Sequence, residues 1–232
     1  MTEEQFIKEV LKLKIELTPT KLLLLEKYYL ILKEWNTKIN LTRIIDKKDV
    51  YLKHFYDSLT IIKVIDLNKN AKIVDLGTGA GFPGLVLKIV FSNLNVTLIE
   101  SCSKKVLFLN EVIKTLELTN IVIIEQRVEQ YALLHREEYD YVVARAFSKL
   151  SILIELGIPL LKIKGKLIAM KGIVPLLNNQ TTLTKIESKV EKIINFKLPI
   201  INHQRTLIVI LKLKKTNKKY PRSYAQIKKK PL

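Results

Sequence analysis

The chain has 232 residues, 48% of them hydrophobic, which is enough apolar material to bury one sizeable core. Its 40 Lys and Arg residues outnumber its 22 Asp and Glu residues, and the formal net charge of +18 favours a polyanionic partner such as nucleic acid or an anionic membrane surface. A single cysteine, Cys102, excludes an internal disulfide framework and any metal site built from several cysteines. The charge indicates a class of partner and not a reaction, because a genome whose base composition favours Lys codons gives the same surplus.

No targeting or membrane segment is predicted. The chain begins Met1-Thr-Glu-Glu, which is acidic and lacks an apolar stretch. The most apolar early run, Leu22 to Trp35, is interrupted by four charged residues, so it does not supply the roughly 20 apolar residues of a membrane span. Together with the single cysteine, these features predict a soluble cytoplasmic protein with no membrane partner.

The first part of the chain is predicted to be helical. Apolar residues recur at helical spacing after Glu3, again after a Thr18-Pro19 start, and a third time from Val50 to Ile62. We therefore expect residues 1–70 to form an N-terminal helical section that packs on the core.

Short β-branched runs alternate with helical segments from Ala71 onward, which is the pattern of βαβ units around a parallel sheet. Helical runs are predicted at Leu85–Phe91, after Lys104, and at Leu150–Leu161. The predicted strands are Lys72–Leu76, Val96–Glu100, Ile121–Glu125, Tyr139–Ala144, Lys166–Met170, Lys192–Phe196 and Thr206–Leu213. We expect residues 71–213 to form an α/β core with a doubly wound, mostly parallel sheet of seven strands, in one compact domain with the helical section.

The end of the chain is strongly basic. Residues 212–232 contain nine Lys or Arg residues and no acid, so half of the net charge lies there. Residues 214–232 are expected to form a basic tail, which is either a solvated arm or one that contacts RNA.

A glycine-rich stretch directly follows the first predicted strand. It reads Asp75-Leu-Gly77-Thr-Gly79-Ala-Gly81-Phe82-Pro-Gly84. Glycine permits positive φ and lets a ligand lie against bare main chain, while the next helix presents unpaired N–H groups. A dinucleotide fingerprint requires glycine where this chain has Phe82. The spacing instead resembles the first motif of class I methyltransferases; the alternative is a turn that only tightens a strand-to-helix corner.

Polar groups follow the next two strands. Glu100 ends the second strand, where a carboxylate accepts hydrogen bonds from both hydroxyls of an adenosine ribose. The alternative is an exposed acid that balances Lys104 and Lys105. Val128 and Glu129 follow the third strand, where main chain and a polar side chain would edge an adenine ring.

Arg145 ends the fourth strand, where in open α/β sheets the reacting partner meets the cofactor. Its other interpretation is a salt bridge to a carboxylate such as Glu129. This strand end lacks the Asn/Asp-Pro-Pro-aromatic element expected of enzymes that methylate exocyclic amines, and no Pro-Cys nucleophile for pyrimidine C5 is present. A ring nitrogen with a free lone pair, such as guanine N7, fits better because no proton has to be removed before it attacks the methyl group.

The histidines give no metal site. His54, His135 and His203 are scattered without metal-ligand spacing, so no metal is predicted. We interpret His135 and His203 as structural.

Together these motifs resemble the glucose-inhibited division protein B family, the bacterial 16S rRNA guanine-N7 methyltransferases. The resemblance spans nearly the whole chain in the family's order. The matching stretches are Asn40-Leu-Thr42, Lys53-His54-Phe55-Tyr-Asp57-Ser58-Leu59, Asp75 to Gly84, Leu98-Ile-Glu100-Ser101, Lys104-Lys105, Phe108, Asn120, Arg127-Val-Glu129, Arg145-Ala-Phe147, Lys171-Gly172 and Tyr220-Pro-Arg222. The family's tail then continues with a Gly-x-Pro element, whereas this chain has Ser223-Tyr-Ala-Gln226-Ile, which leaves the contacts of the tail open.

The resemblance implies a set of site residues. The expected contacts of S-adenosylmethionine are Asp75, Gly77, Gly79, Gly81, Phe82, Glu100, Val128, Glu129 and Arg145. It also implies that four residues of the helical section reach the mouth of the active site, namely Asn40, His54, Asp57 and Ser58. We take Arg145, His54 and Asp57 as the candidate catalytic residues. For His54 and Asp57 the alternative is a buried polar pair, since such residues are costly inside a protein unless they are paired.

The glycine motif and the resemblance thus imply a methyltransferase of the class I type that uses S-adenosylmethionine, and we expect it to be a monomer. Its implied acceptor is N7 of a guanine in 16S rRNA, as naked RNA or in a 30S subunit or assembly particle. Two alternatives stay open. A methyltransferase with a protein or small-molecule acceptor would have an enclosed acceptor pocket and no need for the charge of +18. A non-catalytic RNA-binding module would not bind the cofactor.

Overall fold

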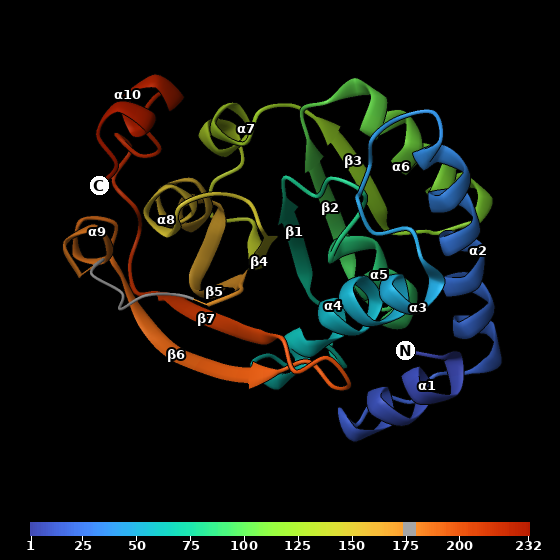
Figure 1. Ribbon diagram of the computed structural model, residues 1–232. Coiled ribbons are helices and arrows are strands. Elements are labelled where there is room, and N and C mark those ends of the chain that lie inside the picture. The colour runs from blue at the N-terminus through green and yellow to red at the C-terminus, as the bar shows by residue number, and fades with distance from the viewer. Residues whose placement is uncertain (174–179) are drawn as a thin grey trace.

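The β-branched runs form one seven-stranded sheet in the order β3-β2-β1-β4-β5-β7-β6 (Figure 1). The structure is a computed structural model and describes residues 1–173 and 180–232. The strands are β1 (Lys72–Leu76), β2 (Asn95–Glu100), β3 (Ile121–Glu125), β4 (Tyr139–Arg145), β5 (Leu161–Lys171), β6 (Ser188–Lys197) and β7 (Gln204–Lys212). The predicted fold class, a doubly wound and mostly parallel sheet of seven strands, is confirmed.

The strand order places one crevice at the carboxyl ends of β1 and β4. Strands β1 to β5 pair in parallel, and β7 is antiparallel to both β5 and β6. Asp75 of β1 is in register with Leu98 of β2 on one side and Val143 of β4 on the other. The chain crosses over in opposite directions from these two strands, and ligands bind where the strand order reverses in this way.

The start of β5 differs from the prediction. A helix was expected over Leu150–Leu161, but α8 ends at Gly157 and a 3₁₀ turn, η3 (Ile158–Leu160), leads straight into β5. Pro159 within that turn has no N–H group for an α-helical hydrogen bond, which ends the helix early. Strand β5 therefore begins five residues before the predicted Lys166.

Helices cover both faces of the sheet and give two apolar clusters. The N-terminal section, α5 (Gly84–Val90) and α6 (Ser103–Thr115) pack on one face, and α7 (Val128–Leu134) and α8 (Leu150–Gly157) pack on the other. Successive strand residues point to opposite faces, so Ile73 belongs to the first cluster and Val74 to the second.

The N-terminal helical section is joined to the glycine turn through aromatic side chains. Its elements are α1 (Glu3–Lys12), α2 (Pro19–Asn36), α3 (Lys47–Val50), the π-helix η1 (Tyr51–Tyr56), α4 (Asp57–Leu59) and the 3₁₀ turn η2 (Thr60–Lys63). Tyr28 of α2 is fully buried, stacks on Phe55 with ring centroids 5.5 Å apart, and lies 5.4 Å from the ring of Phe82. Its hydroxyl donates a hydrogen bond to the carbonyl oxygen of Ala80 inside the turn.

The end of the chain folds back onto the core, so the interpretation as a solvated arm is wrong. Arg222 donates through Nε to Oε1 of Glu155 at 2.7 Å and through Nη2 to Oε2 at 2.6 Å. Glu155 lies on α8 and is 0% exposed. The short helix α10 (Tyr224–Lys229) follows directly, and its Ile227 is fully buried in the cluster under α8. The remaining helix, α9 (Gln180–Lys185), precedes β6.

Within residues 1–173 and 180–232, no helix combines the length and the apolar character that crossing a membrane requires.

Glu155→Ala should lower the free energy of unfolding by about 3 kcal/mol, because it removes the carboxylate that binds Arg222 and leaves a cavity in the interior. The measurement is urea-induced unfolding. The matched control is Glu34→Ala, which breaks an ion pair with Lys38 whose side chains are 65% and 57% exposed and should change stability by less than about 0.5 kcal/mol. Equal losses in the two variants would contradict the anchoring role of Glu155.

Candidate functional site

The buried carboxylate of Asp75 binds both ends of the glycine turn. Its Oδ2 accepts hydrogen bonds from Oγ1 of Thr78 at 2.6 Å and from the main-chain nitrogen of Gly84 at 2.8 Å. Burial raises the pKa of Asp75 to about 6, although both hydrogen bonds act in the opposite direction. Asp75 is 0% exposed, so in this structure it ties the two ends of the turn together from within.

Three glycines give the turn its shape. Gly77, Gly79 and Gly81 have φ of +64°, +61° and +91°, a region that side chains disfavour. A Cβ atom on Gly77 would lie 2.6 Å from Cδ2 of Phe147, whereas one on Gly79 would make ordinary contact with the carbonyl oxygen of Gly77 at 4.0 Å. A Cβ atom on Gly81 would collide with Leu85 and with the hydroxyl of Tyr28. Gly81 thus permits close packing against the helical section, and Gly77 permits the close approach of Phe147, while Gly79 is required for its positive φ and not for space.

A cavity opens beside this turn at the carboxyl ends of β2 and β3, and we refer to it as the glycine-turn cavity. It is lined by Gly77, Ile99, Glu100, Ser101, Gln126, Arg127, Val128, Glu129, Phe147, Ser148, Ile152, Leu156 and Tyr224. Four of the predicted cofactor contacts therefore share one cavity, namely Gly77, Glu100, Val128 and Glu129.

Glu100 is fixed by main-chain donors. Its Oε2 accepts a hydrogen bond from the nitrogen of Gly79 at 3.0 Å, and its Oε1 accepts from the nitrogens of Ser101 and Cys102, both at 2.9 Å. The side chain is buried, so its interpretation as an exposed acid that balances Lys104 and Lys105 is wrong.

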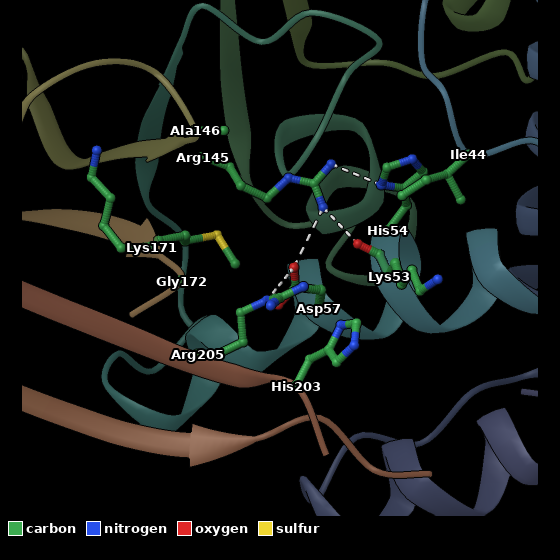
Figure 2. A pocket seen from close by; sticks show the side chains of 11 residues that line it. Ile44, Lys53, His54, Asp57, Arg145, Ala146, Lys171, Gly172, His203 and Arg205 are labelled. Carbon is green, nitrogen blue, oxygen red and sulfur yellow. Dashed lines mark hydrogen bonds and ion pairs between the residues drawn. The ribbon is translucent and has the colours of Figure 1, made fainter. Parts of the chain in front are cut away.

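A second cavity, of about 540 Å³, lies at the carboxyl ends of β4 and β5, and we call it the arginine cavity. It is lined by Ile44, Lys53, His54, Asp57, Arg145, Ala146, Met170, Lys171, Gly172, His203 and Arg205 (Figure 2). Ala146 lines this cavity and the next residue, Phe147, lines the other. The two cavities therefore lie on either side of the segment that follows β4.

Arg145 is held from several directions, as Figure 2 shows. Its Nη1 donates to the carbonyl oxygen of Lys53 and its Nη2 donates to Nδ1 of His54, each at 3.0 Å. The guanidinium carbon lies 4.9 Å from the ring centroid of Phe82, and Nη1 lies 3.7 Å from Oδ2 of Asp57. The ionic partner of Arg145 is thus Asp57 and not Glu129. Burial lowers the pKa of Arg145, and Asp57 opposes that shift.

His54 is a neutral imidazole with both nitrogens engaged. Arginine only donates, so Nδ1 accepts the hydrogen bond from Arg145 and the ring proton resides on Nε2. Nε2 then donates to Oγ1 of Thr42 at 3.0 Å. Burial lowers the pKa of His54 to about 3, and the nearby charge of Arg145 adds to the shift. The π-helix η1 positions His54 so that its ring stacks on Phe82, with centroids 4.4 Å apart.

Arg205 completes the cluster, and no sequence signal pointed to it. Its Nε donates to both carboxylate oxygens of Asp57, at 3.0 and 3.1 Å, across 148 positions of the chain. Asp57 therefore lies between two guanidinium groups. Burial raises the pKa of Asp57, and both arginines act in the opposite direction.

Some predicted residues lie elsewhere. Asp75, Gly81 and Phe82 line neither cavity and instead support the turn and the guanidinium of Arg145. Ser58 is fully buried and donates to the carbonyl oxygen of His54, so it does not reach the mouth of the site. Asn40 is exposed and also lines neither cavity.

His203, interpreted as structural on the sequence alone, is exposed and lines the arginine cavity. His135 lies away from both cavities. Its ring stacks on Tyr131, and its Nδ1 contacts Glu138 at 3.2 Å, which agrees with a structural role.

The neutral state of His54 predicts a pH dependence of stability. Its folded-state pKa of about 3 lies below the unfolded value of 6.5, so the unfolded chain binds the extra proton. The contribution of the neutral His54 to the free energy of unfolding is fully present above about pH 6.5. It is lost at about 1.4 kcal/mol per pH unit as the pH falls towards 3. His54→Gln keeps an acceptor and a donor but does not titrate. Urea unfolding of both proteins between about pH 4 and 7 should give profiles that converge at the acid end; parallel profiles would contradict the neutral imidazole.

Comparisons with known proteins show the family and the fold of this chain. A family model described as rRNA small subunit methyltransferase G (GidB) matches residues 21–209. Ribosomal RNA small subunit methyltransferase G of Desulforamulus reducens is 44% identical, over 100% of this chain and 98% of that protein. The protein of the same name from Bacillus subtilis is 42% identical, over 100% of this chain and 99% of that protein. A solved S-adenosylmethionine-dependent methyltransferase from Aquifex aeolicus has a TM-score of 0.55 at 17% identity, over 72% of this chain and 94% of that one. The chain therefore belongs to the rRNA small subunit methyltransferase G family and has the fold of the class I S-adenosylmethionine-dependent methyltransferases.

Proposed function

We propose that this chain transfers a methyl group from S-adenosylmethionine to N7 of a guanine in 16S rRNA. The observation that carries the proposal is the chemistry of the arginine cavity. The two buried groups there that are suited to accept a proton, His54 and Asp57, already have partners in Arg145, Thr42 and Arg205. Guanine N7 attacks with a free lone pair and needs no base, so a cavity that positions its acceptor without a free buried base suits it.

The glycine-turn cavity is the proposed cofactor site. S-adenosylmethionine supplies an electrophilic methyl group there. Gly77 lines the cavity without a side chain, which leaves room for the ring of Phe147 beside it, because a Cβ atom there would collide with that ring. Glu100 is oriented by three main-chain N–H groups, of which its Oε2 accepts only that of Gly79, so this oxygen has capacity for a ribose hydroxyl. Val128 and Glu129 line the same cavity where a purine ring would lie.

The arginine cavity is the proposed acceptor site. Among the described residues, the guanidinium of Arg145 makes hydrogen bonds to Lys53 and His54, which leaves others of its five N–H groups for a ligand. A guanine presents O6 and N7 on one edge, and arginine donates readily to O6. Donation to O6 would orient the base while N7 keeps its lone pair for the methyl group. A volume of about 540 Å³ has room for a single base turned out of its stack.

The charge around the sites supports an RNA acceptor. Lys53, Lys171 and Arg205 line the arginine cavity itself. The folded tail adds Lys218, Lys219 and Lys230 around a further surface cavity. Such cations contact phosphates and fix the register of an RNA without choosing the base. The relatives named above act on ribosomal RNA of the small subunit according to their names, which supports the same acceptor for this chain.

The direct test is transfer of a labelled methyl group from S-adenosylmethionine to unmodified 16S rRNA and to 30S particles, followed by digestion to nucleosides. We expect label in N7-methylguanosine. Label in another nucleoside would overturn the N7 assignment. Cofactor binding without labelling of either RNA substrate would favour a protein or small-molecule acceptor, and absence of cofactor binding would favour a non-catalytic RNA-binding module.

Gly77→Ala should weaken S-adenosylmethionine binding about tenfold or more, because alanine at φ +64° is strained and its Cβ displaces Phe147 within the cavity. Isothermal titration calorimetry measures the change in Kd. The control is Gly172→Ala. Gly172 lines the arginine cavity and not the glycine-turn cavity, and its added Cβ would have nothing within 4 Å, so the cofactor affinity, which is the quantity measured, should stay unchanged. Wild-type affinity in Gly77→Ala would place the cofactor elsewhere.

A further inference from the structure

The C-terminal segment contributes an aromatic side chain to the glycine-turn cavity. Tyr224, the first residue of α10, lines it together with Gly77, Glu100 and Val128. The side chain is 40% exposed, so a large part of its ring is open to a ligand. This is the stretch at which the sequence departs from the family's Gly-x-Pro element.

The position of Tyr224 is fixed by an ion pair two residues earlier. Both the main-chain nitrogen and the guanidinium of Arg222 donate to the fully buried carboxylate of Glu155. On the other side of Tyr224, Ile227 is fully buried in the apolar cluster to which α8 contributes, and the nitrogen of Ser223 donates to Oε1 of Gln226 at 3.2 Å across the first turn of α10. Anchors on both sides thus hold Tyr224 against the cavity.

Helix α8 connects this anchor to the wall of the cavity. Ile152 and Leu156 lie four residues apart, on one side of α8, and both line the glycine-turn cavity. Glu155 lies between them in sequence and holds the tail. Helix α8 therefore forms one wall of the cavity and also carries Glu155, which fixes the segment that supplies Tyr224. The placement of α10 thus follows from the core.

The chemistry of this wall selects a flat apolar group. The cavity has both polar and apolar lining residues. Its large apolar and aromatic members include Phe147, Val128, Ile152, Leu156 and Tyr224, and its polar members are Glu100, Ser101, Gln126, Arg127, Glu129 and Ser148. Ligand sites that combine apolar and aromatic side chains with several placed polar groups orient a ligand whose ring is flat and whose sugar is polar. Aromatic rings favour offset or edge-on contact with another ring. A purine nucleoside has this distribution of groups.

We propose that Tyr224 packs its ring against the adenine of S-adenosylmethionine, so that the C-terminal tail of this chain is part of its cofactor site. The inference rests on the proposed function, because it takes the glycine-turn cavity as the cofactor site. Tyr224 is then a binding residue supplied from outside the α/β core. The tail has a role at the cofactor that is separate from the contacts of its lysines with RNA.

The test is isothermal titration of full-length protein with S-adenosylmethionine and, separately, with adenosine. Tyr224→Ala should weaken both ligands by a similar factor of about three to ten, because both carry the adenine ring. Tyr224→Phe keeps the ring and should restore the affinity. Ala225→Ser changes the next, exposed position of α10, which lines neither of the two site cavities, and should bind as the wild type does.

The outcomes separate the two proposals. Failure of the wild-type protein to bind S-adenosylmethionine would sink the proposed function itself. Wild-type binding that Tyr224→Ala leaves unchanged would overturn only the role of Tyr224, as would a loss that Tyr224→Phe does not restore. Thermal unfolding of the unliganded variants tests for a merely structural role of Tyr224. The proposal requires that Tyr224→Ala lose affinity for the ligands while its Tm stays at the wild-type value. A Tm that falls together with the affinity would overturn the proposal.

Discussion

A charged arginine buried at the end of β4 is the constraint on which the rest of the site depends. A guanidinium stays protonated in a protein, so burying one requires acceptors at short range. Arg145 finds them in the N-terminal section, in the carbonyl of Lys53, Nδ1 of His54 and the carboxylate of Asp57. The helical section must therefore reach the carboxyl edge of the sheet as well as cover one face, and that reach creates the arginine cavity.

The same helical section also supports the other cavity. In the π-helix η1 and the turn after it, His54 and Asp57 are three residues apart and lie towards Arg145, while Phe55 points into the aromatic cluster with Tyr28. Tyr28 in turn holds the carbonyl of Ala80 in the glycine turn. A π-helix among α-helical turns often marks a functional site, and here it lets one segment contact both the acceptor side and the core beneath the cofactor side.

Local patterns predicted the sheet and the turn, but not the contacts between distant segments. Strands β1 and β3 have the bounds that their β-branched runs predict, and the glycine spacing located the turn because main-chain geometry restricts which residues fit there. Arg205 carries no such local signal, since its role arises only when β7 lies beside β5 and brings it to Asp57 across 148 positions. Tyr224 is similar, because its place depends on a buried ion pair between the tail and α8.

The difference between the two cavities bears on the acceptor. The charged side chains that line the cofactor side are of both signs, since Glu100 and Glu129 are acidic and Arg127 is basic. The acceptor side is built from side chains of separate segments, and two guanidinium groups there face one carboxylate, that of Asp57. His54 adds no charge because its imidazole is neutral. The cluster therefore keeps a surplus positive charge beside the place where the acceptor would bind, and the phosphates of an RNA compensate it more fully than a neutral small molecule does.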